Sequence, residues 1–272
     1  MKVALCLSGQ SRTFKKCFKS QKKHIIDALN PDIFIHTWTF SGSPDIHSTH
    51  NHGYDSEKYK KYVESYQCVV PATDLIKLYK PKKIIVEHPN YNYFIEKIKQ
   101  SNRYKKAEGF EKLFDNDNKY KWFNLLMMYY SIFMSNQLKS EFEQEIDCSY
   151  DIVIRCRMDL YFKKFMIDKT IQSIQNNIIF LPPNEDMDII FNPIMKEQLV
   201  KQGPVYMPND KLAYGNSASM DYYASAYSFF EKDVDFYPHH GEAVMSEHLW
   251  YKNKSEYTNI QINPDIKMKI FR

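Results

Sequence analysis

The segment 8–12, Ser-Gly-Gln-Ser-Arg, contains the first residues whose types and spacing could bind an anion. It follows a short apolar run, and Gly9 would let the backbone approach a ligand closely. The N–H groups that open a following helix can hold an anion, and the guanidinium of Arg12 matches the shape of a phosphate. Ser8, Gly9, Gln10 and Arg12 are therefore candidate phosphate-binding residues. The alternative is a tight strand-to-helix turn with a surface arginine.

A carboxylate, Asp159, follows the apolar run 150–156 in the triplet Arg157-Met158-Asp159. At the end of a buried strand a carboxylate is desolvated and needs a partner. One such partner is a divalent cation that bridges a diphosphate, because hard cations take oxygen ligands. The other is an ion pair with Arg155 or Arg157. On the first interpretation, Asp159 is a metal ligand.

Two later stretches carry groups that could act as a general base. Asp210 lies in the stretch 209–216, which we interpret as a loop before a helix. Glu242 follows a pair of histidines, and His248 comes soon after it. A carboxylate or an imidazole can accept a proton, and an imidazole can also bind a metal. The alternatives are ordinary turn chemistry and unspecialised loop histidines.

Familiar short patterns are missing. The sequence contains neither GxxxxGK[ST] nor GxGxxG, which excludes the P-loop and the usual dinucleotide-binding turn. HExxH is also absent, which makes a metalloprotease a poor interpretation.

Charge favours a small anionic ligand. The chain carries a net charge of +4, which is weak for a nucleic-acid-binding protein. Residues 1–30 contain seven basic residues and one acidic residue, a local charge of +6 that exceeds the net charge of the whole chain. A diphosphate fits this local excess better than a long nucleic acid.

The cysteines and the apolar runs favour a cytoplasmic location. Five cysteines form no CxxC pair, so we expect a reducing, cytoplasmic environment without a structural zinc site. No apolar run is long enough to predict a membrane span or a signal peptide.

These residues need a scaffold, and the apolar pattern predicts one. A strand at 3–7, an amphipathic helix that ends before Pro31 and a strand at 32–38 make a βαβ unit. Further strands are predicted at 83–88, 150–156 and 178–181, and helices at about 73–79, 120–145, 220–230 and 243–252. The alternation predicts an α/β sandwich with a mostly parallel central sheet flanked by helices. Ligands bind beyond the carboxyl ends of such strands, where segments 8–12 and 157–159 stand.

The order and spacing of these motifs resemble a family of glycosyltransferases from bacterial surface-polysaccharide clusters and large DNA viruses. The likeness extends over nearly the whole chain. It rests on the segments 5–12 (LCLSGQSR), 32–38 (DIFIHTW), 128–132 (MYYSI), 150–160 (YDIVIRCRMDL) and 210–215 (DKLAYG).

The resemblance implies a GT-A-like fold, with residues 1–272 as a single domain. Residues 1–160 would bind a nucleotide-sugar donor and residues 161–272 a glycan or other hydroxyl acceptor. Gly9 and Arg12 would lie near the diphosphate, and the triplet 157–159 would stand where such enzymes carry an Asp-x-Asp metal motif. Arg157 replaces the first Asp, and an arginine there could itself neutralise the diphosphate.

The expected activity is therefore a cytoplasmic hexosyl- or pentosyltransferase (in the host cytoplasm if the chain is viral), with Mn²⁺ or Mg²⁺ held by Asp159 and His248. Asp210 and Glu242 are rival catalytic bases. We expect no nucleic-acid partner and no membrane span. One alternative is a non-catalytic nucleotide- or glycan-binding protein on the same fold, which the missing motif Asp favours. The other is a sugar nucleotidyltransferase, although its glycine-rich first loop is absent.

Overall fold

A computed structural model of the chain describes residues 1–40, 72–100, 119–166, 178–183, 209–231, 245, 248–249 and 259–270. The candidate base Glu242 lies outside these residues. So does most of the predicted helix at 243–252.

A seven-stranded sheet forms the centre of the molecule, in the order β3-β2-β1-β4-β7-β6-β8. The first four neighbours, β3 to β4, are parallel to one another. β7 is antiparallel to both β4 and β6, and β8 is parallel to β6. The predicted α/β class with a mostly parallel sheet is confirmed. The strands are β1 (Val3–Gly9), β2 (Asp32–Trp38), β3 (Lys83–Glu87), β4 (Ile152–Arg157), β6 (Ile178–Leu181), β7 (Leu212–Gly215) and β8 (Asn259–Ile262).

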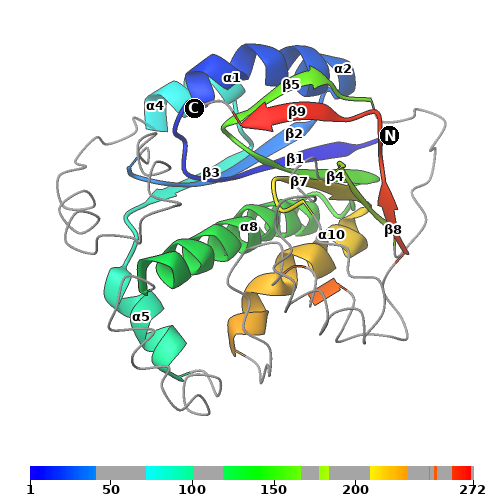
Figure 1. Ribbon diagram of the computed structural model, residues 1–272. Helices are drawn as coiled ribbons and strands as arrows, with labels where there is room; N and C mark the ends of the chain where they lie inside the picture. The colour runs from blue at the N-terminus through cyan, green and yellow to red at the C-terminus, as the bar shows by residue number, and fades with distance from the viewer. Residues whose placement is uncertain are drawn as a thin grey trace, which may run out of the picture.

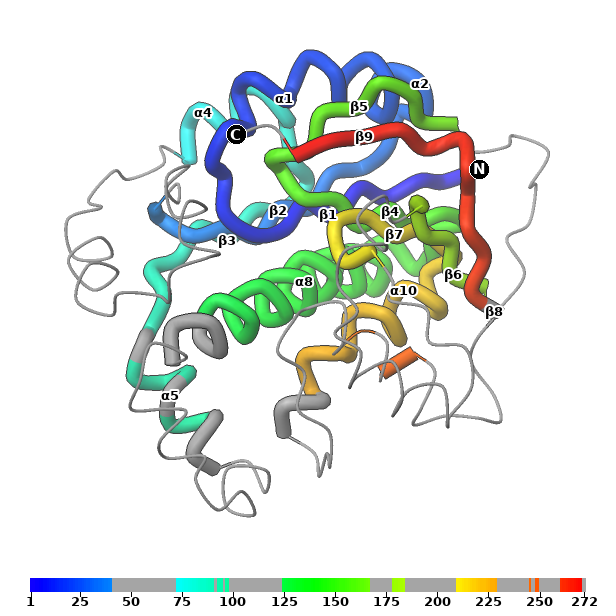
Figure 2. Tube along the Cα trace, viewed as in Figure 1, coloured from blue at the N-terminus to red at the C-terminus, as the bar shows by residue number. Residues whose placement is uncertain are grey.

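Helices cover both faces of this sheet (Figure 1). On one face lie α1 (Phe14–Gln21), α2 (Asp27–Leu29) and α4 (Ala72–Tyr79). On the other lie α8 (Lys119–Glu145) and α10 (Ser217–Ala224), which continues as the 3₁₀ helix η3 (Ser225–Glu231). α5 (Tyr91–Gln100) packs against α8. β5 (Leu160–Lys164) and β9 (Lys267–Ile270) are far apart in sequence but pair as a two-stranded antiparallel sheet. This small sheet lies on the same face of the central sheet as α1 (Figure 2).

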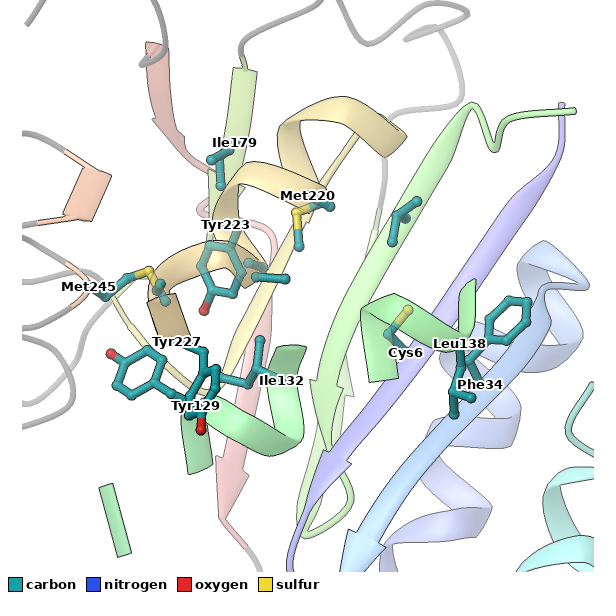
Figure 3. Packing of buried hydrophobic residues seen from close by; sticks show 14 of the residues in the cluster. Cys6, Phe34, Tyr129, Ile132, Leu138, Ile179, Met220, Tyr223, Tyr227 and Met245 are labelled. Carbon is teal, nitrogen blue, oxygen red and sulfur yellow. The ribbon is translucent and has the colours of Figure 1, made fainter. Parts of the chain in front are cut away.

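The two faces bury separate apolar clusters. α8 contributes Leu126, Tyr129 and Ile132 at intervals of three residues, so they share one helical face. Figure 3 shows this face of α8 meeting Met220 and Tyr223 of α10. Within the described part of the chain, no helix combines the length and apolar character needed to cross a bilayer.

The helix after β1 is less regular than its periodicity predicts. α1 passes into a turn of π-helix, η1 (Lys22–Ile26), and then into the short α2. Asn30 ends it in a left-handed conformation, with φ 46°, immediately before Pro31. The predicted stop before Pro31 is therefore confirmed, although the path to it is not one uniform helix.

The interpretation of 209–216 as a loop is wrong. Leu212–Gly215 forms β7, which is buried between β4 and β6. Asp210 and Gly215 made the stretch look like a turn, but Gly215 serves a different purpose. A Cβ at this position would lie 2.8 Å from the carbonyl oxygen of Ile178, so only glycine lets β6 approach. The helix that follows begins at Ser217, earlier than predicted, because the Asn216 side chain accepts a hydrogen bond from the backbone N–H of Ser219 at 2.8 Å.

Candidate functional site

The carboxyl ends of β1, β2, β3 and β4 form one edge of the sheet, because these strands are parallel. Ser8 lies directly opposite Arg157 in the neighbouring strand. The two segments that the sequence singled out, 8–12 and 157–159, therefore meet at this edge.

Asp159 lies at this edge in the turn between β4 and β5, with only 1% of its surface exposed. Arg157 binds it in a bidentate manner: Nε donates to Oδ1 at 2.9 Å and Nη2 to Oδ2 at 2.8 Å. Arg12 adds a third bond, from Nη1 to Oδ2, at 3.2 Å. The carboxylate thus joins the turn after β1 to the end of β4. Of the two partners predicted for Asp159, the structure shows the arginine.

Arg12 is held in an unusual backbone conformation, with φ 38°. A non-glycine residue in this region is strained and persists only where its surroundings fix it. Here its Nε donates to Oε1 of Gln10 at 2.9 Å, in addition to the bond to Asp159. Gln10 therefore positions Arg12. Strain of this kind gathers at ligand sites, which makes the turn a candidate binding element.

Gln21 fixes the turn that carries Asp159. It is fully buried on α1, and its Nε2 donates to the carbonyl oxygens of Met158 and Leu160, each at 3.0 Å. Tyr79 of α4 donates in turn to Oε1 of Gln21 at 2.8 Å. The orientation of Asp159 is thus set by two helices.

The electrostatics favour an ionised Asp159. Burial acts to raise the pKa of this carboxyl, but the guanidinium groups of Arg157 and Arg12 outweigh burial and hold its pKa below the usual value. The side chains that bind this carboxylate are both cations, so a divalent cation would have to displace a guanidinium or lie beside it. As arranged, these residues do not fit a bound Mn²⁺ or Mg²⁺. Among the described residues, no group of three or more His, Cys, Asp or Glu side chains could hold a metal ion.

Arg155 lies deeper than Arg157 on the same strand, with 2% of its surface exposed. Its Nε donates to Oγ of Ser8 at 3.1 Å, and its Nη1 donates to the backbone carbonyl of Asp210. Ser8 therefore contributes its hydroxyl to holding a guanidinium. Through the same guanidinium, Asp210 is connected to the edge that carries Arg157.

A second polar network joins β1, β2, β3 and α8. His36 is fully buried, with Nδ1 2.9 Å from Oγ of Ser131 and Nε2 2.7 Å from Oε1 of Glu87. The Ser131 hydroxyl also accepts the N–H of Gly9 at 2.7 Å. Gly9 has φ 101°, a conformation that favours glycine, and this bond fixes it. The turn after β1 is thus held from the helix side as well as from Asp159.

The network also fixes the charge of Glu87. The hydrogen bond from His36 is the main cause that lowers the pKa of this carboxyl, against the opposing effect of burial. Tyr130 also interacts with Glu87, and burial together with the Glu87 carboxylate raises the pKa of Tyr130 to about 12.

The structure brings most of the predicted site residues together. Asp210 is 7% exposed and reaches the group through its carbonyl. His248 contacts α10 and its continuation η3, through Tyr222 and Ser225. Its ring stacks on Tyr222 of α10 at 4.5 Å, and its Nε2 lies 2.7 Å from the Tyr222 carbonyl. Ser8, Gly9, Gln10, Arg12, Arg157 and Asp159 all lie at or next to the carboxyl edge of β1 and β4.

Comparison with known proteins gives one kind of likeness. No family model matches the chain, and no curated protein matches it. The fold is similar to the crystal structure of the galactosyltransferase LgtC in complex with donor and acceptor sugar analogs. The two chains are 10% identical, the match covers 96% of this chain and 73% of that one, and the TM-score is 0.42.

Sequence reasoning named Arg155 only as an alternative ion-pair partner of Asp159, and it did not place His36 or Ser131 in the site. Each is a polar residue inside an otherwise apolar strand or helix face, and each is buried. A charged or polar side chain interrupting such a run has to find a partner, so the interruption itself could have marked them.

Proposed function

We propose that the chain is a glycosyltransferase that moves a sugar from a nucleotide-sugar donor to a glycan or other hydroxyl acceptor. The observation that carries this proposal is the arginine cluster, which we define as Arg12, Arg155 and Arg157 together with Asp159. It stands at the carboxyl edge of a mostly parallel sheet, where α/β folds bind their ligands. The family resemblance of the sequence motifs supports the same activity.

The charge of the cluster suits a diphosphate. Arg12 and Arg157 bind one carboxylate, that of Asp159, and Arg155 binds none, so positive charge is in excess among the described residues of the cluster. Guanidinium is always protonated in proteins and presents a planar fork that matches phosphate oxygens. A nucleoside diphosphate would neutralise this excess.

The cluster would also serve the reaction. When the bond between the sugar and the diphosphate breaks, negative charge develops on the leaving phosphate. Fixed cations that are already oriented lower the energy of that state more than mobile water does. Asp159 would hold Arg157 and Arg12 in position for this role, because both bind its oxygens.

The later part of the chain would bind the acceptor. We propose residues 1–160 for donor binding and 161–272 for acceptor binding within one domain. Asp210 is the first candidate for the base that accepts the acceptor proton, since its backbone contacts Arg155 at the donor edge. Glu242 stays a rival prediction. An alanine variant that loses the acidic limb of the pH–rate profile, with donor binding unchanged, marks the base.

The metal stays a prediction. Mn²⁺ or Mg²⁺ would supply positive charge at the diphosphate. The described arrangement already supplies arginines at Asp159, so no step here depends on a metal at Asp159 or His248.

Incubation with a panel of nucleotide sugars, with and without Mn²⁺, tests the proposal by following the release of nucleoside diphosphate. Transfer, or slow hydrolysis of one donor, is expected. Saturable nucleotide binding without turnover would support the non-catalytic alternative instead. Release of pyrophosphate from a nucleoside triphosphate and a sugar phosphate would support a nucleotidyltransferase.

A further inference from the structure

Arg155 is a buried cation that has no carboxylate partner among the described residues. Its described partners are a hydroxyl, that of Ser8, and a carbonyl, that of Asp210. Its second terminal nitrogen, Nη2, is buried and has no hydrogen-bond partner among the described residues. Burying a charge costs several kcal/mol unless it is paired. The guanidinium cannot avoid that cost by losing its proton.

A second buried polar atom at this edge also has no partner among the described residues. It is Oγ of Ser11, in the turn that follows β1, and Ser11 is fully buried. Buried hydroxyl and guanidinium groups are hydrogen-bonded in most native proteins, so an unpartnered one is a place where a bound group can supply the missing bond. Ser11 follows β1, and Arg155 lies in the neighbouring strand β4, two residues before its end.

The neighbouring arginines are in a different situation. Arg12 and Arg157 share the carboxylate of Asp159. Arg157 is two residues from Arg155 on the same strand, a separation of about 6.6 Å. An oxyanion that enters this edge therefore finds its strongest unmet attraction at Arg155.

We propose that Arg155 is a direct ligand of the donor phosphate, with Nη2 donating to a phosphate oxygen while Ser8 and the Asp210 carbonyl hold the guanidinium in place. The inference rests on the proposed function for the identity of the donor, a nucleoside-diphosphate sugar. The bound group is an oxyanion. Its source is a phosphate rather than the carboxylate of an acidic sugar, because the arginines beside it suit a group with several charged oxygens.

Calorimetric titration with pyrophosphate, for wild type and Arg155→Met, tests this inference. Methionine fills similar space without charge. Wild type should bind pyrophosphate, and the variant should bind it at least tenfold more weakly, since hydrogen bonds to charged groups are worth about 1.5–3 kcal/mol. Lys83→Met, which removes a cation on the neighbouring part of the sheet, is the control and should leave the affinity unchanged.

Thermal unfolding without ligand separates this role from a structural one. A buried guanidinium that is not fully bonded destabilises the ligand-free protein. Arg155→Met should therefore unfold at the wild-type temperature or above it. Unchanged pyrophosphate affinity in Arg155→Met overturns the inference. If that variant does not fold, Arg155→Lys decides, because it keeps the charge and loses the fork. Wild-type affinity in Arg155→Lys overturns the inference, and a clear loss supports it.

Two further arms separate this inference from the proposed function. Glucuronate bound through Arg155, with no binding of pyrophosphate, would overturn the phosphate assignment. Pyrophosphate bound through Arg155 in a protein that turns over no nucleotide sugar would refute the glycosyltransferase and leave the phosphate site standing. Sugar transfer, with pyrophosphate affinity unchanged in Arg155→Met, would support the glycosyltransferase and overturn the phosphate site at Arg155.

Discussion

Two groups of charged side chains, each with a buried cation, differ in how fully that cation is bonded. The lysine cluster, which we define as Lys139, Glu143, Ser217 and Asp221, places one cation between two carboxylates. Lys139 is fully buried, and its Nζ lies 2.9 Å from Glu143, 2.8 Å from Asp221 and 2.5 Å from Oγ of Ser217. In the arginine cluster, Arg12 and Arg157 bind the carboxylate of Asp159, whereas Arg155 binds Ser8 and has no carboxylate partner among the described residues.

The bonds of the lysine cluster stay within the fold. Glu143 also accepts the backbone N–H of Tyr150, just before β4, at 2.7 Å, and Asp221 accepts from Asn136 at 2.7 Å. The cluster therefore ties α8 to α10 and to the start of β4. The arginine cluster leaves a buried guanidinium nitrogen with no partner among the described residues. The buried cation of the lysine cluster is bonded within the fold, whereas the buried cation Arg155 keeps an unbonded nitrogen where a ligand is expected.

Removing the cation of the lysine cluster should have the largest effect on stability. Lys139→Met leaves two carboxylates facing each other at the α8–α10 contact, and breaking a buried ion pair costs about 3 kcal/mol or more. We expect this loss in the free energy of unfolding measured by urea denaturation, with nucleotide affinity of the folded fraction unchanged. Lys83→Met is the control, since its partners Glu141 and Glu145 are exposed and such pairs contribute about 0–1 kcal/mol. Equal losses in the two variants would contradict the distinction between the clusters.

Removing the carboxylate of the arginine cluster should change activity more than stability. Asp159→Asn keeps the size of the side chain but releases Arg157 and Arg12, so we expect donor turnover to fall about a hundredfold, which corresponds to about 2.7 kcal/mol. Steady-state release of nucleoside diphosphate measures this. Asp265→Asn, which removes an exposed partner of Lys164, is the matched control and should behave as wild type. Near-normal turnover in Asp159→Asn would exclude a role for this carboxylate as anchor or as metal ligand.

A single arginine of the cluster should matter for affinity. Arg12→Ala should weaken nucleoside diphosphate binding about tenfold, because one charge-assisted contact is lost. Calorimetry measures this, with the exposed Lys15→Ala as control. Arg12→Gly should bind equally weakly but be more stable than Arg12→Ala by about 1 kcal/mol, since glycine relieves the strain at φ 38°. An unchanged affinity in both variants would place the diphosphate elsewhere.

The smallest expected effect is on the pH dependence of stability, through Glu87. The pKa of Glu87 is lower in the folded chain than its unfolded value of about 4.3, chiefly because His36 donates to it. Ionised Glu87 therefore stabilises the fold above that pH, and the contribution is lost as the pH falls through the folded pKa. Glu87→Gln should be less stable than wild type at pH 7 by a few tenths of a kcal/mol, a value reduced by solvent screening, and the difference should vanish by about pH 3. A difference that grows in acid would mean that the sign of the interaction is wrong.

Most of the parallel part of the sheet could be predicted from the sequence, because its strands are continuous apolar runs separated by helical periodicity. β7 could not, since four residues between Asp210 and Asn216 carry too little pattern, and its burial comes from β4 and β6. β5, β8 and β9 were likewise not predicted. In the site, Arg12, Arg157 and Asp159 were found because they follow strands. Whether Asp159 binds a metal or an arginine could not be predicted from the sequence, because either partner satisfies a buried carboxylate.

The position of β7 also has a consequence for how the chain is made. β1 to β4 can assemble as soon as they leave the ribosome, but β4 then has an open edge until β7 arrives later in synthesis and fills it. An open hydrophobic edge is a template for aggregation, and charged side chains in an edge strand oppose it. Arg155 and Arg157 lie in that strand. The same two arginines would therefore oppose aggregation of the nascent chain through β4, before β7 has been synthesised.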